Sequence, residues 1–200
     1  MDKHQQNIRF FNRWAKSYDN SFPVSFWLKR MQKDVLRFIV KRPGLKILDV
    51  SCGTGELLLS LSRRIEKPSL FGVDISANML KIAEKKLGSK ASLKYSSADK
   101  LPFKDSTFHY MITTEAFHHY THQEKSIQEM KRVLKPNGRL IIADVNFFFD
   151  TFHRIFEFFE PGCVKINSRK EFIRMFQRNG FKNIRQLRTN VLGIITTGVK

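Results

Sequence analysis

Acidic residues and glycines gather where this sequence changes from a strand-like to a helix-like pattern. The segment Asp49-Val50-Ser51-Cys52-Gly53-Thr54-Gly55-Glu56 follows an apolar run, and its glycines let the backbone turn sharply and approach a ligand without a Cβ in the way. Asp74 ends the next apolar run, 21 residues after Gly53, and Asp99 follows a third run. A carboxylate at Asp74 can accept from both hydroxyls of a ribose, and Asp99 can accept from an adenine amine. The pattern predicts a site for an adenosine-like ligand.

The ligand of this glycine loop is expected to carry no phosphate. A dinucleotide fingerprint needs a third glycine where the sequence has Leu58. Glu56 places a negative charge at the start of the next helix, where a pyrophosphate would bind, and no Gly-Lys-Ser/Thr of a Walker loop follows. The cationic, phosphate-free nucleoside S-adenosylmethionine (SAM) is compatible with that charge. Two alternatives stay open: Asp74 can be a helix cap, although Ser76 suits that role better, and Asp99 can be a solvated turn residue.

Residues that follow the fourth predicted strand can accept or donate a proton. Methyl transfer from a sulfonium is a direct displacement that depends on alignment, so no metal ligands are expected. A base is needed only if the acceptor must lose a proton. Glu115, His118 and His119 are the candidates, because histidine titrates near neutral pH, although either histidine can equally be a packed or capping residue. Tyr18 and Asp19 belong to an N-terminal segment that can fold over a bound cofactor.

The elements that must position these residues alternate between strand and helix, a pattern typical of βαβ units and a parallel sheet. Strands are predicted at residues 46–51, 69–74, 92–96, 108–113 and 139–144, and helices at 24–40, 56–64, 78–87, 123–134 and 170–178. Capping-box spacings, Thr121 with Glu124 and Ser168 with Glu171, mark the starts of the last two helices. Two final strands, 183–189 and 192–199, are joined so closely that they must be antiparallel.

The composition is that of one α/β domain with a strongly basic surface. Of the 200 residues, 42% are hydrophobic and 27% charged, which suits a packed core, and no run is apolar enough to span a membrane. Only two cysteines and no signal-like start favour a reducing, cytoplasmic location. The net charge of +18 is concentrated at the two ends, with +8 in residues 1–46 and +7 in 151–200. This charge can serve solubility or attract an anionic substrate, nucleic acid or an acidic membrane surface.

An aromatic segment, residues 147–160, interrupts the pattern before the last helix. If it is helical, one face combines Phe148, Phe152, Ile155, Phe156 and Phe159. Since the segment lies at the ligand end of the sheet, this face can wall an apolar or aromatic substrate pocket, or it can pack on the sheet. The other face carries Asp150, Glu157 and Glu160, which is unfavourable for contact with acidic lipid. The helix at 24–40 has a basic face that can touch membrane or nucleic acid, or simply be solvated.

The motifs together resemble those of class I SAM-dependent methyltransferases. The matching segments are 47–57, 71–76, 98–108, 117–120 and 130–140. Within that class the sequence is similar to the type 11 small-molecule enzymes, including the ubiquinone/menaquinone C-methyltransferase branch, which the segment Phe11-Asn12-Arg13-Trp14-Ala15-Lys16-Ser17-Tyr18-Asp19 also resembles. The resemblance covers roughly residues 8–200. Two positions depart from the pattern: Ser51 replaces the usual first glycine of the loop, and His109 stands where an Asp commonly opens the fourth strand.

The resemblance implies a Rossmann-like α/β fold. The expected sheet has seven strands, mostly parallel with an antiparallel last strand, and helices on both faces. A single methyltransferase domain would span residues 1–200, with an N-terminal helical cap (1–45), a SAM-binding core (46–145), a substrate-side insertion (146–168), and a final helix with a strand hairpin (169–200).

The resemblance also implies roles for the site residues. Asp49 and the glycine loop would hold the methionine end of SAM, Asp74 the ribose and Asp99 the adenine, and Glu115 would lie near the transferable methyl group. The full set expected at the cofactor is Tyr18, Asp49, Ser51, Cys52, Gly53, Thr54, Gly55, Asp74, Ile75, Asp99, Lys100 and Glu115.

The implied activity is methyl transfer from SAM to a small apolar, aromatic or anionic acceptor, with S-adenosyl-L-homocysteine as product. The charge of +18 also suits a methyltransferase that acts on RNA or protein. A third alternative is a SAM-binding regulator without catalysis, because residues that bind SAM do not guarantee turnover. Against a base-amine enzyme, the fourth strand is followed by Thr-Thr-Glu-Ala rather than an Asn/Asp-Pro-Pro-Tyr/Phe loop.

Overall fold

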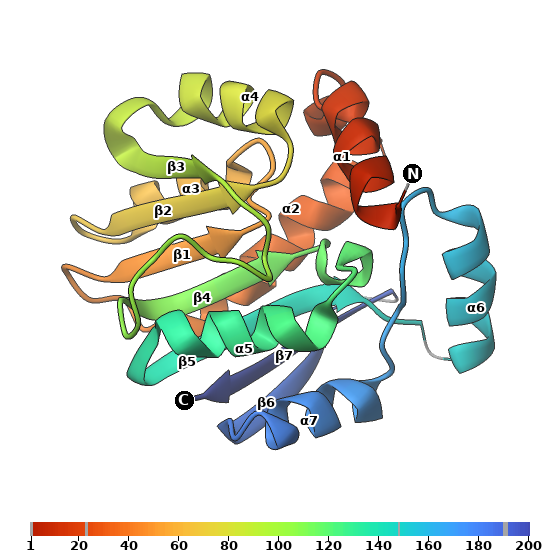
Figure 1. Cartoon of the computed structure of the whole chain (residues 1–200). Coiled ribbons are helices and arrows are strands. Elements are labelled where there is room, and N and C mark those ends of the chain that lie inside the picture. The colour runs from red at the N-terminus through yellow and green to blue at the C-terminus, as the bar shows by residue number, and fades with distance from the viewer. Residues whose placement is uncertain (1, 23, 148, 190–191) are drawn as a thin grey trace.

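A seven-stranded sheet runs through the centre of the computed structural model, which describes residues 2–22, 24–147, 149–189 and 192–200 (Figure 1). The strands are β1 (Lys46–Val50), β2 (Ser69–Asp74), β3 (Ala91–Tyr95), β4 (Phe108–Thr114), β5 (Leu134–Val145), β6 (Lys182–Thr189) and β7 (Gly193–Val199). The helices are α1 (Lys3–Trp14), α2 (Val24–Val35), α3 (Glu56–Arg64), α4 (Ala77–Leu87), α5 (Gln123–Val133), α6 (Asp150–Phe159) and α7 (Arg169–Arg178). Short 3-10 helices are η1 (Tyr18–Asn20), η2 (Leu36–Phe38), η3 (Gly88–Lys90) and η4 (Phe117–His119). The predicted α/β class is confirmed.

The order of the strands creates the site. The sheet runs β3-β2-β1-β4-β5-β7-β6. The first five strands are parallel, while β7 is antiparallel to both β5 and β6. Strand β1 pairs with β2 on one side and with β4 on the other. The chain therefore builds the sheet from β1 toward one edge and then from β4 toward the opposite edge. Open α/β sheets bind ligands at such a switch point, beyond the carboxyl ends of the strands.

Alternate strand residues face two separate layers of helices, as a pleated strand requires. On one face, Ile47 of β1 packs in a buried cluster with residues of α2, α3 and α4. On the other face, its neighbour Leu48 packs with residues of α5 and α7, which lie in front of the sheet in Figure 1. The two layers hold the strand ends rigidly, so that the loops beyond them have a fixed base.

Helix α1 stands across the carboxyl ends of the strands (Figure 1). Its Asn12 ties it to α4, because the Ser76 hydroxyl donates to Asn12 Oδ1 and the Asn78 amide donates to the Asn12 carbonyl. At the other end of α1, the buried Asn7 donates to the carbonyl of His119 in η4. The N-terminal segment is therefore fixed over the end of the sheet.

One predicted helix cap and one predicted strand start are wrong for physical reasons. Helix α5 has no side-chain cap: Glu124, the expected capping partner of Thr121, instead accepts from the Asn179 amide. Strand β5 begins at Leu134 rather than after Pro136, because the segment 135–138 bulges where the register with β4 shifts. The other strands and helices that were predicted begin within one residue of the expected position.

Other expected features of the elements are confirmed. Ser168 and Glu171 form the predicted capping box at the start of α7, and the last two strands form the expected antiparallel pair. The helix expected at 24–40 ends at Val35 and continues as η2. Its apolar stripe is buried, with Leu28, Met31 and Val35 all less than a tenth exposed.

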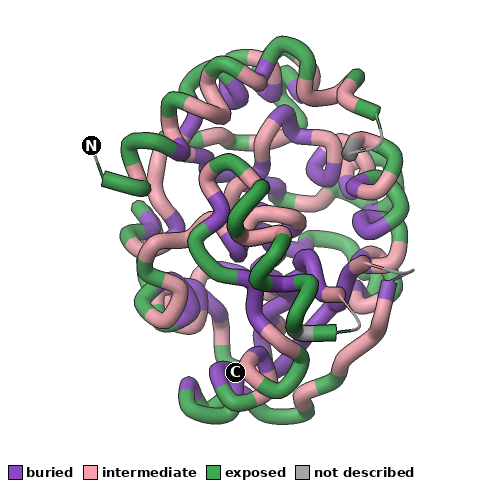
Figure 2. Tube along the Cα trace, turned by 90° about the vertical axis from the view of Figure 1, so that its right-hand side faces the viewer, coloured by how far each residue is buried: buried purple, intermediate pink, exposed green. Residues whose placement is uncertain are grey.

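The prediction for the aromatic segment holds only in part. Phe156 of α6 turns inward and packs on Phe147, but Phe152, Ile155 and Phe159 are 51%, 49% and 74% exposed. The expected five-residue wall is therefore wrong for these three, and Phe148 lies outside the described residues. Figure 2 views this end of the molecule and shows most of α6 as exposed chain.

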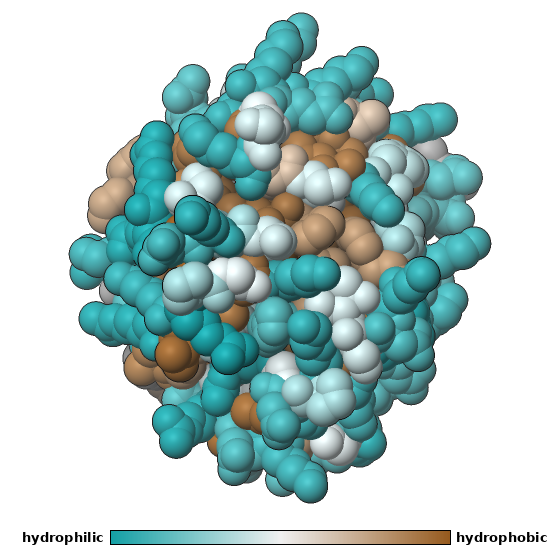
Figure 3. All heavy atoms as spheres, turned by 90° about the vertical axis from the view of Figure 1, so that its left-hand side faces the viewer, coloured by the Kyte–Doolittle hydropathy of each residue, from teal (hydrophilic) through white to brown (hydrophobic). Residues whose placement is uncertain are grey.

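The opposite end of the molecule, at the amino ends of the parallel strands, is covered mostly by hydrophilic side chains (Figure 3). Within the described part of the chain, no helix has both the length and the apolar character that crossing a bilayer would require.

Candidate active site

The turn after β1 and the end of β2 are joined by Asp74. Its Oδ2 accepts from the Gly53 backbone N–H at 2.8 Å, and its Oδ1 accepts from the Ser76 N–H at 2.8 Å. Burial raises the pKa of Asp74 to about 6, although the backbone N–H groups of Ser76, Gly53 and Ile75 oppose the increase. Helix α4 is capped by the Ser76 hydroxyl, which accepts from the Met79 N–H. Asp74 is therefore not the cap of α4.

The two glycines of the loop are required for different structural reasons. Both have positive φ, +52° for Gly53 and +82° for Gly55, a region that favours glycine. A Cβ on Gly53 would meet only the Tyr18 ring, at 4.0 Å, whereas a Cβ on Gly55 would lie 2.8 Å from Leu87. Gly55 thus allows α3 to approach α4, and Gly53 keeps open the space under Tyr18.

Asp49, near the end of β1, has one side-chain oxygen that is buried without a partner in the described part of the chain. The residue is 1% exposed, and its Oδ1 has no hydrogen-bond partner among the described residues. Burial raises the pKa of Asp49 well above its usual value, and the neighbouring Asp74 carboxylate adds to the increase. A buried carboxylate without a partner is costly, so a cationic group bound here would relieve that cost.

A cavity opens between the glycine loop and α1, here called the loop cavity. Its volume is about 60 Å³, and six residues that the sequence predicted for the cofactor line it: Tyr18, Ser51, Gly53, Asp74, Ile75 and Glu115. The Tyr120 hydroxyl, which also lines it, lies 3.0 Å from the hydroxyls of both Ser51 and Thr113. The structure thus brings half of the predicted cofactor set to one space.

A smaller hollow of about 30 Å³, the Asp99 pocket, adjoins the loop cavity. The two share Ser51, Ile75, His119 and Tyr120. Partial burial tends to raise the pKa of the Asp99 carboxyl, but the Ser97 hydroxyl, Lys125 and His122 outweigh that effect and lower it. The carboxylate is thus ionised and able to accept a hydrogen bond.

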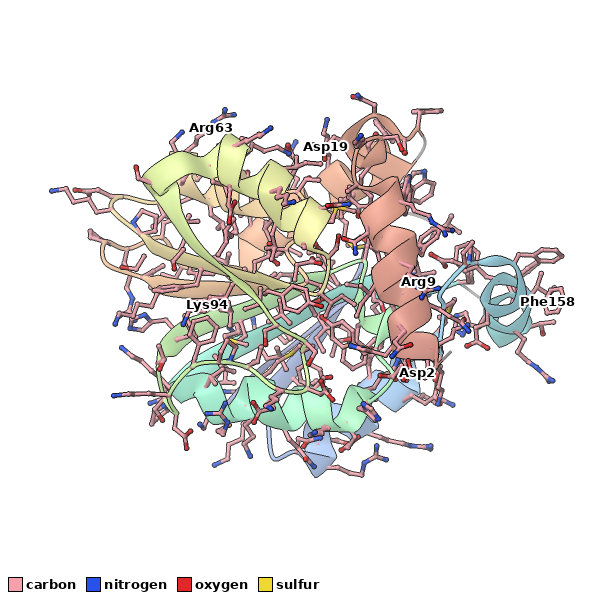
Figure 4. The ribbon with its side chains drawn as sticks, turned by 45° about the horizontal axis from the view of Figure 1, so that its top comes forward. Asp2, Arg9, Asp19, Arg63, Lys94 and Phe158 are labelled. Atoms are coloured by element: carbon pink, nitrogen blue, oxygen red, sulfur yellow. The ribbon has the colours of Figure 1, made fainter. Side chains whose placement is uncertain are left out.

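Five predicted residues, the buried Asp49 and four others, line none of these spaces. Cys52 is buried against β2, Gly55 serves helix packing, and the Lys100 side chain is exposed. The Thr54 hydroxyl donates to Asp19, whose second oxygen lies 2.8 Å from Lys86 Nζ. Figure 4 shows Asp19 where the end of the N-terminal segment meets α4. This contact anchors the segment that carries Tyr18.

A larger cavity of about 210 Å³, the aromatic cavity, lies on the far side of Tyr18 and Glu115. Phe11, Tyr18, Glu115 and His119 border both it and the loop cavity. Its apolar lining comes from α1, α2, β5, the segment around α6 and the residue before β7: Phe11, Trp14, Trp27, Met31, Val145, Phe147, Phe156 and Leu192. A flat apolar molecule placed there would lie next to whatever fills the loop cavity.

One end of the aromatic cavity is polar. His118 is 1% exposed, with its Nδ1 2.6 Å from Asp144 and its Nε2 3.3 Å from Glu160. Burial disfavours the charged imidazole, but the carboxylates of Asp144 and Glu160 overcome this and raise the pKa of His118 well above its usual value. The pKa of His119 moves the opposite way, because burial and the charge of His118 lower it.

Glu115 lies at the boundary between the two cavities. It has a positive φ of +52°, a conformation that is uncommon outside glycine and typical of functional turns. Burial and the nearby Asp144 carboxylate raise the pKa of Glu115 to about 8, although His118 opposes the increase. A carboxyl with such a pKa can exchange a proton near neutral pH.

Sequence reasoning missed several residues of this site. Asp144, at the end of β5, could have been found, because it follows the same rule as Asp49 and Asp74: a carboxylate at the carboxyl end of a parallel strand. Glu160 was placed on the outer face of a helix, but it follows the end of α6, and the chain turns it back toward His118. No local sequence signal marks that return.

Comparison with known proteins agrees with this geometry. Residues 47–138 match a family model described as a methyltransferase domain. Demethylmenaquinone methyltransferase of Staphylococcus aureus is 29% identical over 213 residues, covering 90% of this chain and 87% of that protein. A chain in the complex of the Haloferax volcanii Trm112 methyltransferase activator with a methyltransferase has the same fold, with a TM-score of 0.84 at 19% identity, covering 97% of this chain and 96% of that one. A SAM-dependent methyltransferase of Aquifex aeolicus gives 0.75 at 22% identity, covering 94% and 97%.

Fold, site and matches together define a class I SAM-dependent methyltransferase. This chain is such an enzyme, with SAM as its cofactor, and it is related to the quinone methyltransferases. The residues present fit SAM: the free oxygen of Asp49 suits a cationic group, and the open side of Gly53 leaves room for a ligand.

Proposed function

We propose that this enzyme transfers a methyl group to a small hydroxylated aromatic acceptor of the quinol class. The observation that carries the proposal is the aromatic cavity, which shares Tyr18 and Glu115 with the loop cavity. Aromatic and apolar lining with a few convergent polar groups is typical of small-molecule sites. The similarity to demethylmenaquinone methyltransferase supports the same acceptor class.

The residues around the loop cavity would hold the cofactor. Asp74 accepts from the ribose hydroxyls, Asp49 meets the cationic methionine end, and Asp99 accepts from the adenine amine. When bound, SAM supplies an electrophilic methyl group on its sulfonium. Tyr18 covers the loop at the open side of Gly53 and excludes water from the space between the two cavities.

Glu115 is the group best placed to take a proton from the acceptor. It borders both cavities, and its pKa of about 8 lies near the working pH, where general bases are most effective. Removing the proton from an acceptor hydroxyl makes its oxygen, and the ring carbon conjugated with it, more nucleophilic. The aromatic walls hold the ring in place, so alignment contributes much of the rate enhancement.

A labelled-methyl assay tests this proposal. Purified enzyme with methyl-labelled SAM would be offered a short-tailed demethylmenaquinol, total tRNA and a protein extract in parallel. We expect label on the quinol only, and little product from Glu115→Gln even though calorimetry still detects SAM binding. Label on RNA or protein would replace the proposed acceptor class, and SAM binding without any labelled product would favour a non-catalytic regulator.

A further inference from the structure

Three donor side chains meet at the polar end of the aromatic cavity. His118 and His119 are neighbours in η4, and Glu160 follows α6, some forty residues later in the chain. Nε2 of His118 lies 3.3 Å from Oε1 of Glu160, and Nε2 of His119 lies 3.7 Å from the same oxygen. One donor atom from each residue lies within 4.8 Å of the other two. We propose that His118, His119 and Glu160 bind a divalent transition-metal ion such as Zn²⁺.

The His118–Glu160 distance of 3.3 Å suits a shared ion, and the His119–Glu160 distance of 3.7 Å is a few tenths of an ångström longer than one ion would set. A charge-assisted bond between imidazole and carboxylate is about 2.7–2.9 Å long, shorter than either contact to Glu160. Donors that each lie about 2.1 Å from one zinc ion are separated from one another by about 3.0–3.5 Å. Two imidazoles and one carboxylate also form a donor set that Zn²⁺ and its transition-metal neighbours prefer over Ca²⁺ or Mg²⁺.

The surroundings of His118 resemble the outer shell of a metal site. Its Nδ1 is 2.6 Å from Asp144, which fixes the orientation of the ring and directs Nε2 toward Glu160. Histidines that bind metals commonly have their other nitrogen bonded to a carboxylate in this way. The second oxygen of Glu160 is buried without a partner among the described residues. A carboxylate oxygen in that state is expensive unless a cation binds it.

The site would retain open coordination positions on the side of the cavity. All three side chains line the aromatic cavity, so an acceptor can reach the ion directly. Three protein ligands with an open position are typical of catalytic rather than structural zinc sites. An ion there would bind and polarise an acceptor oxygen. This use rests on the proposed function, whereas binding of the ion itself does not.

The proposal goes beyond the expectation from sequence, which included no metal. That expectation considered only the displacement at the sulfonium, which needs none. Glu160, which the periodicity of the segment placed on an outer helix face, lies next to both histidines in the structure.

Metal binding can be measured without SAM or acceptor. Chelator-treated full-length enzyme would be dialysed against Zn²⁺ and analysed for bound metal, and titrated with Co²⁺, whose visible absorption reports its ligands. We expect one ion per chain for the wild type. Glu160→Gln and His119→Asn should each weaken binding by at least about tenfold, the lower limit for disturbing a metal site. Both side chains are less buried than His118, and thermal melting would verify the fold.

A matched control is His109→Asn, which removes a histidine at the amino end of β4, where it accepts from the Lys46 N–H. This variant should bind the ion as the wild type does. Substoichiometric metal in the wild type, or equal affinity in Glu160→Gln and wild type, would overturn the proposal and leave His118 as a charged bridge between Asp144 and Glu160. Because SAM binding is measured separately, loss of the metal site would not be mistaken for failure of the methyltransferase assignment.

Discussion

The loop cavity and the aromatic cavity lie side by side, yet they are built in different ways. Much of the polar lining of the loop cavity comes from the turn after β1 and from the carboxyl ends of β2 and β4, with backbone N–H groups fixing Asp74. The aromatic cavity takes its lining from α1, α2, β5, the segment around α6 and the residue before β7, which are far apart in the chain. A site made of strand ends is specified by short motifs, whereas a site made between helices depends on how the helices pack. The two halves should therefore respond separately to mutation.

The largest difference between the effects on catalysis and on SAM binding is expected from Glu115→Gln. The amide keeps the size of the side chain but cannot accept a proton, and general-base catalysis contributes about 10²–10⁴ in rate. We expect kcat to fall by about that factor while the Kd for SAM stays within about twofold. Rapid-quench measurements of labelled product, with calorimetry of SAM binding, would check both. An unchanged kcat would show that proton removal lies elsewhere, and a lost SAM affinity would show that Glu115 serves the cofactor.

The reciprocal variant, Asp74→Asn, should affect the loop cavity. Hydrogen bonds to a charged group contribute about 1.5–3 kcal/mol each, so SAM affinity should fall about 10- to 100-fold. The KM for the acceptor should change little, because Asp74 does not line the aromatic cavity. Calorimetry with SAM and with S-adenosyl-L-homocysteine would measure the loss. Equal affinity for wild type and variant would remove Asp74 from the ribose role.

The same carboxylate should make SAM binding sensitive to pH. With its pKa raised to about 6, Asp74 is ionised above that pH and loses its acceptor capacity as the pH falls through it. At pH 5 about a tenth of the molecules retain the carboxylate, so the apparent Kd should rise about tenfold relative to pH 7.5. Tyr18 and Glu115 line the same cavity. Tyr18 stays neutral because burial raises its pKa, and Glu115, with a pKa raised to about 8, titrates above this range.

The control for this pH effect is Asp74→Asn, which has no carboxyl to titrate at this position. Its SAM affinity should vary with pH much less than that of the wild type over the same range. If both proteins lose affinity in parallel, the titrating group is not Asp74.

Sequence reasoning predicted local geometry well where adjacent residues decide the structure. The glycine loop, Asp74 and the capping box at Ser168 each follow from a few adjacent residues and the backbone geometry that they require. It failed where distant segments compete. Glu124 binds Asn179 instead of capping its own helix, and Glu160 turns toward His118. Periodicity placed Phe152 and Phe156 on one face, but tertiary packing turned only Phe156 inward.

Two phenylalanines of α6 test whether the acceptor contacts only the side chains that line the aromatic cavity, and the expected effects are the smallest of those described. Phe156 lines the aromatic cavity, whereas Phe158 is 84% exposed and projects away from the body of the protein (Figure 4). Phe156→Ala should raise the acceptor KM by about 10-fold, because loss of a ring contact in a pocket costs about 1–1.5 kcal/mol. Phe158→Ala should leave KM unchanged and alter stability by no more than about 0.5 kcal/mol.

Both variants should bind SAM like the wild type, because neither residue borders the loop cavity. The measurements are acceptor KM, calorimetry with SAM, and denaturant unfolding for the two alanine variants in parallel. Equal effects on KM would mean that the acceptor contacts the outer surface of α6 as well as the cavity. A change in SAM affinity would mean that α6 and the cofactor are coupled. The loop cavity and the aromatic cavity would then not respond separately to mutation.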